Sequence, residues 1–168
     1  MTIPPRIHLR GGPPDDAVSV LIDASGPGVP RVLHWGAAID DGPLAPEPQL
    51  AWGARLNAPV PLTLLPTEGR RFFGEPAVSL QPAGAAYLDL KLTGVETAEE
   101  TAVFTLADGG LILRITLTLD AETGVLETRT RIEAAAPTEL RWLASACLPL
   151  PDRAAEQLTL TGDWADEF

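Results

Sequence analysis

The second half of this chain alternates between apolar and polar residues along several successive segments. The clearest are LILRITLTL at Leu111–Leu119 and VLETRTRIE at residues 125–133, and a shorter one, YLDLKL, covers residues 87–92. A period of two places every second side chain on the same face, as in a strand with one buried and one exposed face. These segments therefore predict strands rather than helices.

Turn-forming residues separate the alternating segments. They are Asp108-Gly109-Gly110, residues 120–124 and Ala136-Pro137-Thr138, and the glutamates after Val95 predict another hairpin loop. Glycine accepts the positive φ that tight hairpin turns require, so we expect antiparallel hairpins instead of βαβ crossovers. Segments 17–23 and 31–35 are further expected strands. The sequence predicts an all-β fold, an antiparallel β-sandwich with little or no helix and at most a single helical turn.

The length and charge of the chain restrict its class. The 168 residues are enough for one domain with a core of its own, and too few for a second domain as large as a (β/α)₈ barrel, which needs about 250 residues. A net charge of −11 argues against a surface that binds nucleic acid, because such a surface must neutralise phosphates. The start has no pattern of a secretory signal, and no apolar run is long enough to span a bilayer. We therefore expect a cytoplasmic protein that binds neither nucleic acid nor membrane.

The sequence offers no set of residues for independent catalysis or metal binding. His8, His34 and the lone Cys147 have no neighbours at metal-ligand spacing. We expect His34 to be a hydrogen-bonded structural histidine and Cys147 to be a small buried hydrophobe. Solvated charge is the favoured interpretation of the close carboxylate pairs, which are Asp40 and Asp41, Glu99 and Glu100, and Asp163 and Asp166. We predict no catalytic residue, no metal and no cofactor.

Two segments combine arginine with aromatic residues. Trp52 lies in a proline-rich stretch, residues 40–61, that cannot form a central strand, and Arg55 follows it closely. Arg70 and Phe73 belong to the second segment, which reads RRFF after Gly69. Each pair could stack on a sugar face and bind its hydroxyls, or could anchor an interface. We name Trp52, Arg55, Arg70 and Phe73 as candidates for substrate-side or interface contacts.

The remaining tryptophans of the strand regions favour a different role. Trp35 and Trp142 both lie in segments expected to be strands. A large aromatic side chain in a half-buried strand contributes most by burying its ring. We therefore expect both side chains to pack in the core.

Four segments, in this order, resemble one known family. They are LHWGA at residues 33–37, LLPTEGRRFFGEPA at 64–77, the alternating strands from 104 to 132, and LPLPDRAAEQLTLTGDWADEF at 148–168. Together they are similar to the amino-terminal, supersandwich-like β-sandwich of bacterial α-galactosidases (melibiases) of glycoside hydrolase family 36. The resemblance implies one β-sandwich domain over residues 1–168 that precedes a (β/α)₈ catalytic barrel absent from these residues.

The resemblance also implies a function and its partners. Family members hydrolyse terminal α-galactosides with retention, using two aspartates on the barrel, so this chain is expected to be inactive alone. The sandwich would support the barrel and a homo-oligomer, and loops 44–57 and 68–76 would approach a substrate site for α-galactoside sugars. A surface meant for the barrel would promote self-association when exposed. The alternative is a free-standing carbohydrate-binding or scaffold module.

Overall fold

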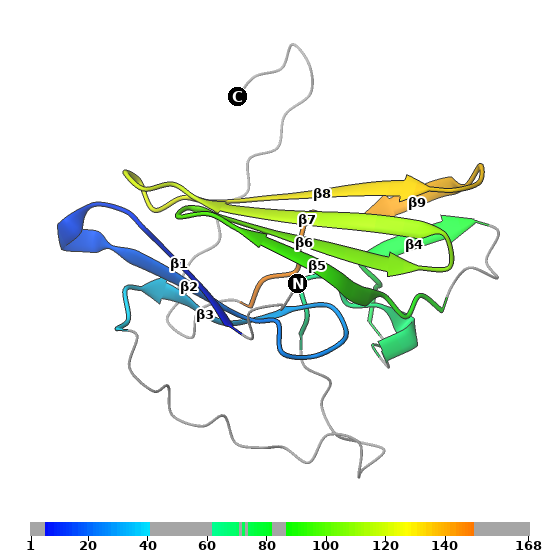
Figure 1. Ribbon diagram of the computed structural model, residues 1–168, viewed down its shortest axis with the longest axis horizontal. Coiled ribbons are helices and arrows are strands. Elements are labelled where there is room, and N and C mark those ends of the chain that lie inside the picture. The colour runs from blue at the N-terminus through cyan, green and yellow to red at the C-terminus, as the bar shows by residue number, and fades with distance from the viewer. Residues whose placement is uncertain (1–5, 41–61, 71, 73, 82–86, 150–168) are drawn as a thin grey trace, which may run out of the picture.

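The computed structural model describes residues 6–40, 62–70, 72, 74–81 and 87–149. Within them the chain forms nine strands and two single-turn 3-10 helices (Figure 1). The strands are β1 (Arg6–Gly11), β2 (Val18–Asp23), β3 (Arg31–Ala37), β4 (Val78–Gln81), β5 (Lys91–Thr97), β6 (Thr101–Asp108), β7 (Leu111–Leu119), β8 (Leu126–Ala134) and β9 (Glu139–Leu143). The helical turns are η1 (Pro14–Asp16) and η2 (Glu68–Arg70).

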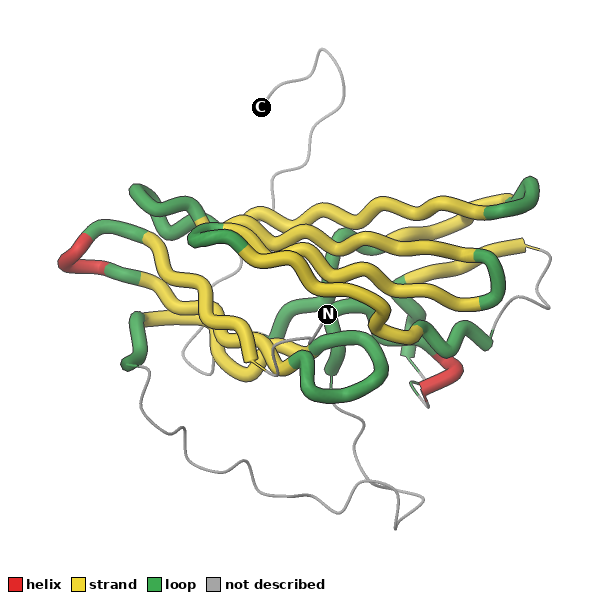
Figure 2. Tube along the Cα trace, in the orientation of Figure 1, coloured by secondary structure: helices red, strands yellow, loops and turns green. Residues whose placement is uncertain are grey.

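The strands form two packed layers. Strands β5, β6, β7 and β8 make an antiparallel meander, and β1, β2 and β3 make a second antiparallel sheet beneath it (Figure 1). Strands β4 and β9 pair with each other as a two-stranded antiparallel ribbon. Figure 2 shows that helix is confined to the two short turns. The predicted antiparallel β-sandwich with little or no helix is confirmed, and the described residues contain two helical turns where at most one was expected.

Alternation along the strands builds the core between the layers. In β7 every second residue from Leu113 to Leu119 is buried, while Ile112 and Arg114 point outward. Strand β6 buries Phe104, whose register partner in β7 is Ile115. In the lower sheet β1 alternates in this way and buries Leu9, whereas β2 buries four consecutive residues, Ser19 to Ile22. The period of two seen in the sequence is therefore the period of burial.

The predicted turns join the predicted strands. Gly109 and Gly110 connect β6 to β7 with φ angles of 52° and 91°, which residues with a side chain rarely adopt. Between β7 and β8 the carboxylate of Asp120 accepts hydrogen bonds from the backbone and hydroxyl of Thr123, at 2.7 and 2.6 Å. Glu99 and Glu100 lie in the exposed loop between β5 and β6, as expected.

One strand begins several residues after the start of the alternating segment that predicted it. Strand β5 starts at Lys91, although the alternation starts at residue 87 and Leu88 and Leu90 are buried. The backbone N–H of Asp89 donates to the side chain of Asp108 at 2.7 Å instead of to a strand carbonyl. That side chain takes the place of a ladder partner, so the segment is extended but unpaired.

The segment that follows β9 is hydrogen-bonded to two earlier segments of the chain. Its backbone N–H groups at Ala144 and Cys147 donate to the carbonyls of Ala77 and Leu64, at 2.8 and 2.7 Å. Cys147 packs partly buried against the core, and this burial raises the pKa of its thiol. The expected role of Cys147 as a small hydrophobe agrees with this position.

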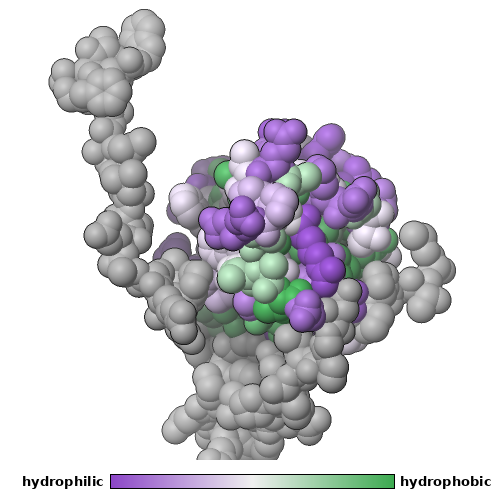
Figure 3. All heavy atoms as spheres, turned by 90° about the vertical axis from the view of Figure 1, so that its left-hand side faces the viewer, coloured by the Kyte–Doolittle hydropathy of each residue, from purple (hydrophilic) through white to green (hydrophobic). Residues whose placement is uncertain are grey.

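The end of the sandwich that carries η1 has a largely polar surface. Seen from that side, hydrophilic residues cover most of the upper part of the described surface, with smaller apolar areas between them (Figure 3). Asp15 and Asp16 of η1 and the Asp120 turn are exposed residues there. No helix among the described residues is long and apolar enough to cross a membrane.

Candidate functional site

Of the four candidate residues, Arg70 lies in the described part of the chain. Trp52, Arg55 and Phe73 lie outside the described residues, as does loop 44–57. Arg70 is the last residue of η2, and its backbone N–H donates to the carbonyl of Thr67 at 3.1 Å. The structure therefore tests the surroundings of Arg70 and leaves the grouping of the four residues as a prediction.

The η2 turn lies against the backbone that leads into β5. A Cβ atom placed on Gly69 would come within 2.4 Å of the carbonyl oxygen of Leu88, closer than any side chain tolerates. Glycine is therefore the residue that allows this approach. The contact places Arg70 next to Asp89, which is 19 positions away in the sequence.

Arg70 and Asp89 form a close ion pair. The Nε atom of Arg70 is 2.6 Å from Oδ1 of Asp89, and both atoms are inaccessible to solvent although their side chains are partly exposed. The two atoms are in charge contact but are not aligned as a hydrogen bond. Because the side chains reach solvent, this pair contributes modestly to stability.

Lys91 holds the other carboxylate oxygen of Asp89. Its ammonium group donates to Oδ2 of Asp89 at 2.5 Å. The hydrogen bond from Lys91 is the largest influence on the Asp89 carboxyl, followed by burial, which opposes it, and by the charges of Arg70 and Lys91. Their sum lowers the pKa of Asp89, so this carboxylate is ionised and shared between two cations.

The guanidinium of Arg70 also covers the loop between β2 and β3. A Cβ atom on Gly28 would lie 3.0 Å from Nη2 of Arg70, so the planar group rests against the backbone there. Gly26 and Gly28 lie in the loop that joins the antiparallel strands β2 and β3. Arg70 thus joins three segments, namely the β2–β3 loop, η2 and the start of β5.

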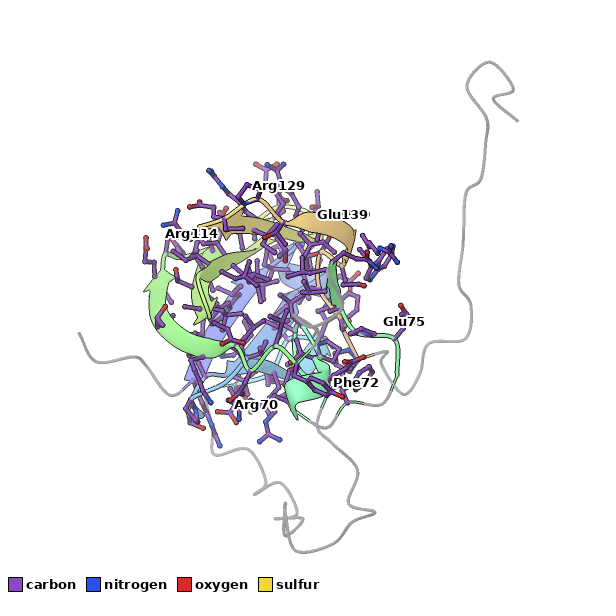
Figure 4. All side chains as sticks on the ribbon, turned by 90° about the vertical axis from the view of Figure 1, so that its right-hand side faces the viewer. Arg70, Phe72, Glu75, Arg114, Arg129 and Glu139 are labelled. Carbon is purple, nitrogen blue, oxygen red and sulfur yellow. The ribbon has the colours of Figure 1, made fainter. Side chains whose placement is uncertain are left out.

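Phe72 completes the described part of the second arginine–aromatic segment. Its ring packs over Gly74, where an added Cβ atom would come within 2.7 Å of the ring. Phe72 is half-buried, and Figure 4 shows it beside Arg70, on the side of the molecule opposite Arg114 and Arg129. Among the described residues, this segment is therefore held by intramolecular contacts.

The two histidines have structural hydrogen bonds. Nε2 of His34 lies 2.9 Å from the carbonyl oxygen of Ala37, and Nε2 of His8 lies 2.9 Å from the hydroxyl of Ser19. Ser19 is fully buried and accepts a hydrogen bond from the backbone N–H of Ile39 at 3.1 Å. Its hydroxyl hydrogen is then free to be donated to His8. The expected hydrogen bond of His34 is confirmed, and His8 has one as well.

Asp23 is a largely buried carboxylate with a defined set of partners, and 17% of its side chain is exposed. Arg31 donates to its Oδ2 from Nε and Nη2, at 3.1 and 3.0 Å, and the backbone and hydroxyl of Ser25 donate to its Oδ1. Burial is the largest single influence and raises the pKa of Asp23, but the hydrogen bonds from Ser25 and Arg31 together outweigh it. The resulting pKa lies below the ordinary value, so Asp23 is a fixed anion.

Trp35 and Trp142 differ from each other in a way that the sequence did not predict. Trp35 packs against the core, as expected. The expectation for Trp142 is wrong, because 53% of this residue is exposed. The indole points outward because of a bulge in the pairing of β4 with β9. The sequence ELRWL of β9 gives no indication of that bulge.

The described residues contain no group of three or more histidine, cysteine or acidic side chains arranged to hold a metal ion. One shallow hollow of the surface lies on the outer face of β7 and β8, between Thr116, Thr118, Glu127 and Arg129. Glu127 and Arg129 form an ion pair with each other there. The hollow is therefore lined by polar groups, two of which are already paired.

Comparison with known proteins relates this architecture to one family. The sequence profile of the glycosyl hydrolase family 36 N-terminal domain matches residues 28–168. No curated protein matches the sequence significantly.

Two solved structures share the fold. The GH36 α-galactosidase AgaA from Geobacillus stearothermophilus superposes with a TM-score of 0.62 at 20% identity, over 77% of this chain and 22% of that one. The GH36 α-galactosidase AgaB from the same organism gives 0.57 at 18% identity, over 77% of this chain and 21% of that one. The chain thus spans about a fifth of the length of these enzymes.

Proposed function

The chain belongs to the family of glycosyl hydrolase family 36 N-terminal domains, and from this membership we propose that it is the non-catalytic domain of an α-galactosidase-like glycoside hydrolase. In this role residues 1–168 form one sandwich domain that supports a catalytic (β/α)₈ barrel and the oligomer of the enzyme. The observation that carries the proposal is the profile match over residues 28–168, together with a sandwich fold like that of AgaA and AgaB.

Three carboxylates of the described residues are held as structural anions, which suits a supporting role. A glycosidase needs one carboxyl group whose pKa is raised, so that it can protonate the leaving oxygen. Asp23, Asp89 and Asp120 each have a lowered pKa, and each is bound by neighbouring donors of the fold. These carboxylates stay ionised at neutral pH and act as structural anions.

The contacts of Arg70 favour an indirect part in any substrate site. Because its guanidinium rests on Gly28 and faces Asp89, Arg70 fixes the path of residues 68–70 more readily than it reaches a sugar. We propose that it positions the loop of residues 68–76 for contact with a barrel or a second subunit. Trp52, Arg55 and Phe73 remain proposed substrate-side or interface contacts, with α-galactosides as the proposed sugars.

A cytoplasmic location and an oligomeric enzyme are further parts of the proposal. The test begins by reading the genomic frame beyond the codon for Phe168. If it encodes a barrel, the enzyme is expressed with and without residues 1–168. We expect the complete enzyme to hydrolyse an aryl α-galactoside and the isolated barrel to be insoluble or unable to assemble. A barrel that keeps full activity and the same oligomeric state without these residues would contradict the supporting role.

A free-standing carbohydrate-binding or scaffold sandwich is the alternative. The half-exposed Trp142 favours it, since stacking on a sugar requires an accessible aromatic ring. A stop codon directly after Phe168, together with sugar binding by the natural protein, would support this alternative over the supporting domain.

A further inference from the structure

Trp142 occupies an unusual position for a tryptophan in a small sandwich. It lies in β9 directly opposite Ser79 of β4, and 53% of it is exposed. Ser79 is small, so it leaves the neighbouring indole uncovered. An exposed tryptophan forgoes the large gain that burial of its ring would give, and this calls for another role.

A bulge determines which side chains share the outer face of the β4–β9 ribbon. The register shifts between Ser79 and Leu80, so that Arg141 is the extra residue of β9 and has no partner in the ladder. Val78 and Leu80, which are buried, pair with Leu143 and Leu140. Bulges redirect side chains in this manner.

The outer face of the ribbon consequently gathers one aromatic ring and several polar groups. Ser79 pairs with Trp142, and Gln81 pairs with Glu139. Nε of Arg141 lies 3.7 Å from Oε1 of Glu139, which places these two side chains on the same side. We call Ser79, Gln81, Glu139, Arg141 and Trp142 the Trp142 platform. Figure 4 shows Glu139 on the upper, outer side of the molecule, the side on which Arg129 also lies.

The charged groups of the platform remain available to a ligand. The side chains of Arg141 and Glu139 are 54% and 67% exposed, and their separation of 3.7 Å exceeds a hydrogen-bond distance. Both groups can therefore exchange a bound water for a ligand hydroxyl at a small cost in free energy. A guanidinium offers two parallel donors and a carboxylate two acceptors, which suits vicinal hydroxyl groups.

The composition of the platform distinguishes between two kinds of occupant. A stable protein interface buries about 800 Å² on each partner around an apolar centre. In the Trp142 platform a single indole lies beside hydroxyl, amide and charged groups, and the 44% exposed Leu140 pairs with the buried Leu80, away from the outer face, so the platform does not supply such a centre. A pyranose ring has an apolar C–H face of about the size of an indole and a rim of hydroxyls, and this matches the platform. We propose that the Trp142 platform binds the pyranose ring of a carbohydrate.

In this arrangement the sugar C–H face stacks on the indole while Glu139, Arg141 and Gln81 bind hydroxyls at its rim. The site goes beyond the proposed supporting role and does not require a barrel. Only the choice of an α-galactoside as the first probe rests on the proposed function. If the proposed supporting role is wrong, the platform could still bind another hexopyranoside. The two proposals can therefore fail separately.

The test uses the 168-residue protein and three probes, namely methyl α-D-galactopyranoside, raffinose and methyl α-D-glucopyranoside. Nuclear magnetic resonance follows the indole N–H signals while each sugar is added to about 50 mM, well above a dissociation constant of about 1 mM for an open site. We expect the Trp142 signal to shift and saturate with at least one probe. If the glucoside and the galactoside bind equally, this result supports sugar binding by the platform and rejects a preference for galactosides.

Matched variants assign the binding to the platform. Trp142→Ala should weaken binding at least tenfold, and Glu139→Gln and Arg141→Ala should each weaken it severalfold. Tyr87→Ala is the control, because Tyr87 is 79% exposed and lies outside the platform. Circular dichroism verifies that every variant is folded.

Three results would overturn the proposal. The first is the absence of any saturating shift of the Trp142 signal with all three probes. The second is undiminished sugar binding by the folded Trp142→Ala variant. The third is a loss of self-association in Trp142→Ala with no change in sugar binding, which would assign the platform to a protein contact.

Discussion

Arg114 of β7 lies directly opposite Arg131 of β8, so two cationic side chains are cross-strand neighbours on the outer face of the four-stranded sheet. Arg131 has a carboxylate partner in Glu133 at 3.1 Å, and among the described residues Arg114 has no ion pair. Like charges at directly opposed positions destabilise a sheet. In a chain of net charge −11, this pair is a local exception that costs stability.

We expect Arg114→Thr to stabilise the fold by about 0.5 kcal/mol, because it removes the repulsion and introduces a residue suited to strands. Urea unfolding at low and high salt measures the effect. The gain should shrink at high salt, where exposed charges are screened. Arg114→Lys keeps the charge and should bring no such gain. A loss of stability in Arg114→Thr, independent of salt, would refute this electrostatic explanation.

Phe104 should be among the most sensitive core positions, because it is completely buried at the centre of β6. Phe104→Ala removes a large side chain from the packed interior and should cost about 3–5 kcal/mol. Val103→Ala, on the outer face of the same strand, should cost less than about 1 kcal/mol. Thermal and urea unfolding compare the two variants, and similar losses would mean that the layers do not pack as described.

Gly69→Ala should destabilise the fold by about 1–3 kcal/mol, because its Cβ atom would meet the backbone carbonyl of Leu88 at 2.4 Å. The matched control is Gly26→Ala, since nothing lies within 4 Å of a Cβ atom there. The control should be close to neutral. Urea unfolding of both variants is the measurement, and a neutral Gly69→Ala would show that η2 does not lie against residue 88.

Asp23 should contribute to the acid dependence of stability. Its pKa is lowered in the folded state, so the unfolded state binds more protons as the pH falls. The contribution is fully present above the unfolded value of about 3.9 and is lost as the pH falls through the folded pKa. Asp23→Asn should therefore lower stability at pH 7 by about 1–3 kcal/mol through the lost charged hydrogen bonds.

Unfolding midpoints measured between pH 7 and pH 2.5 examine this prediction. The difference between the wild-type protein and Asp23→Asn should narrow below pH 4, where the wild-type carboxyl also becomes neutral. A constant difference across the whole range would indicate that Asp23 acts through packing instead of charge.

The sequence predicted those parts of the fold whose signals are local. The bounds of β7 match its alternating segment, Leu111–Leu119, because β6 and β8, which pair with it on either side, have the same alternation of two residues. Gly109 and Gly110 mark the hairpin between β6 and β7 because their positive φ angles restrict residue choice. Strand β4 was missed, since four residues are too few to show a period.

The candidate site was harder to predict because its contacts are distant in the sequence. Arg70 was singled out by its aromatic neighbours, yet its main partner is Asp89, and the alternation of residues 87–92 gives no indication of that contact. Trp142 was assigned to the core because the bulge opposite Ser79 depends on pairing between β4 and β9. Pairing between distant segments determines the direction of the side chains, and the sequence of one strand alone does not show how that strand pairs.

The most direct test of the central claim is an assay of the purified 168-residue protein with an aryl α-galactoside at neutral pH. The account predicts no hydrolysis above the rate without protein, because in the proposed role this sandwich supports a catalytic site on another domain. Saturable hydrolysis that copurifies with the folded protein, and that disappears when a carboxylate within residues 1–168 is replaced, would contradict it.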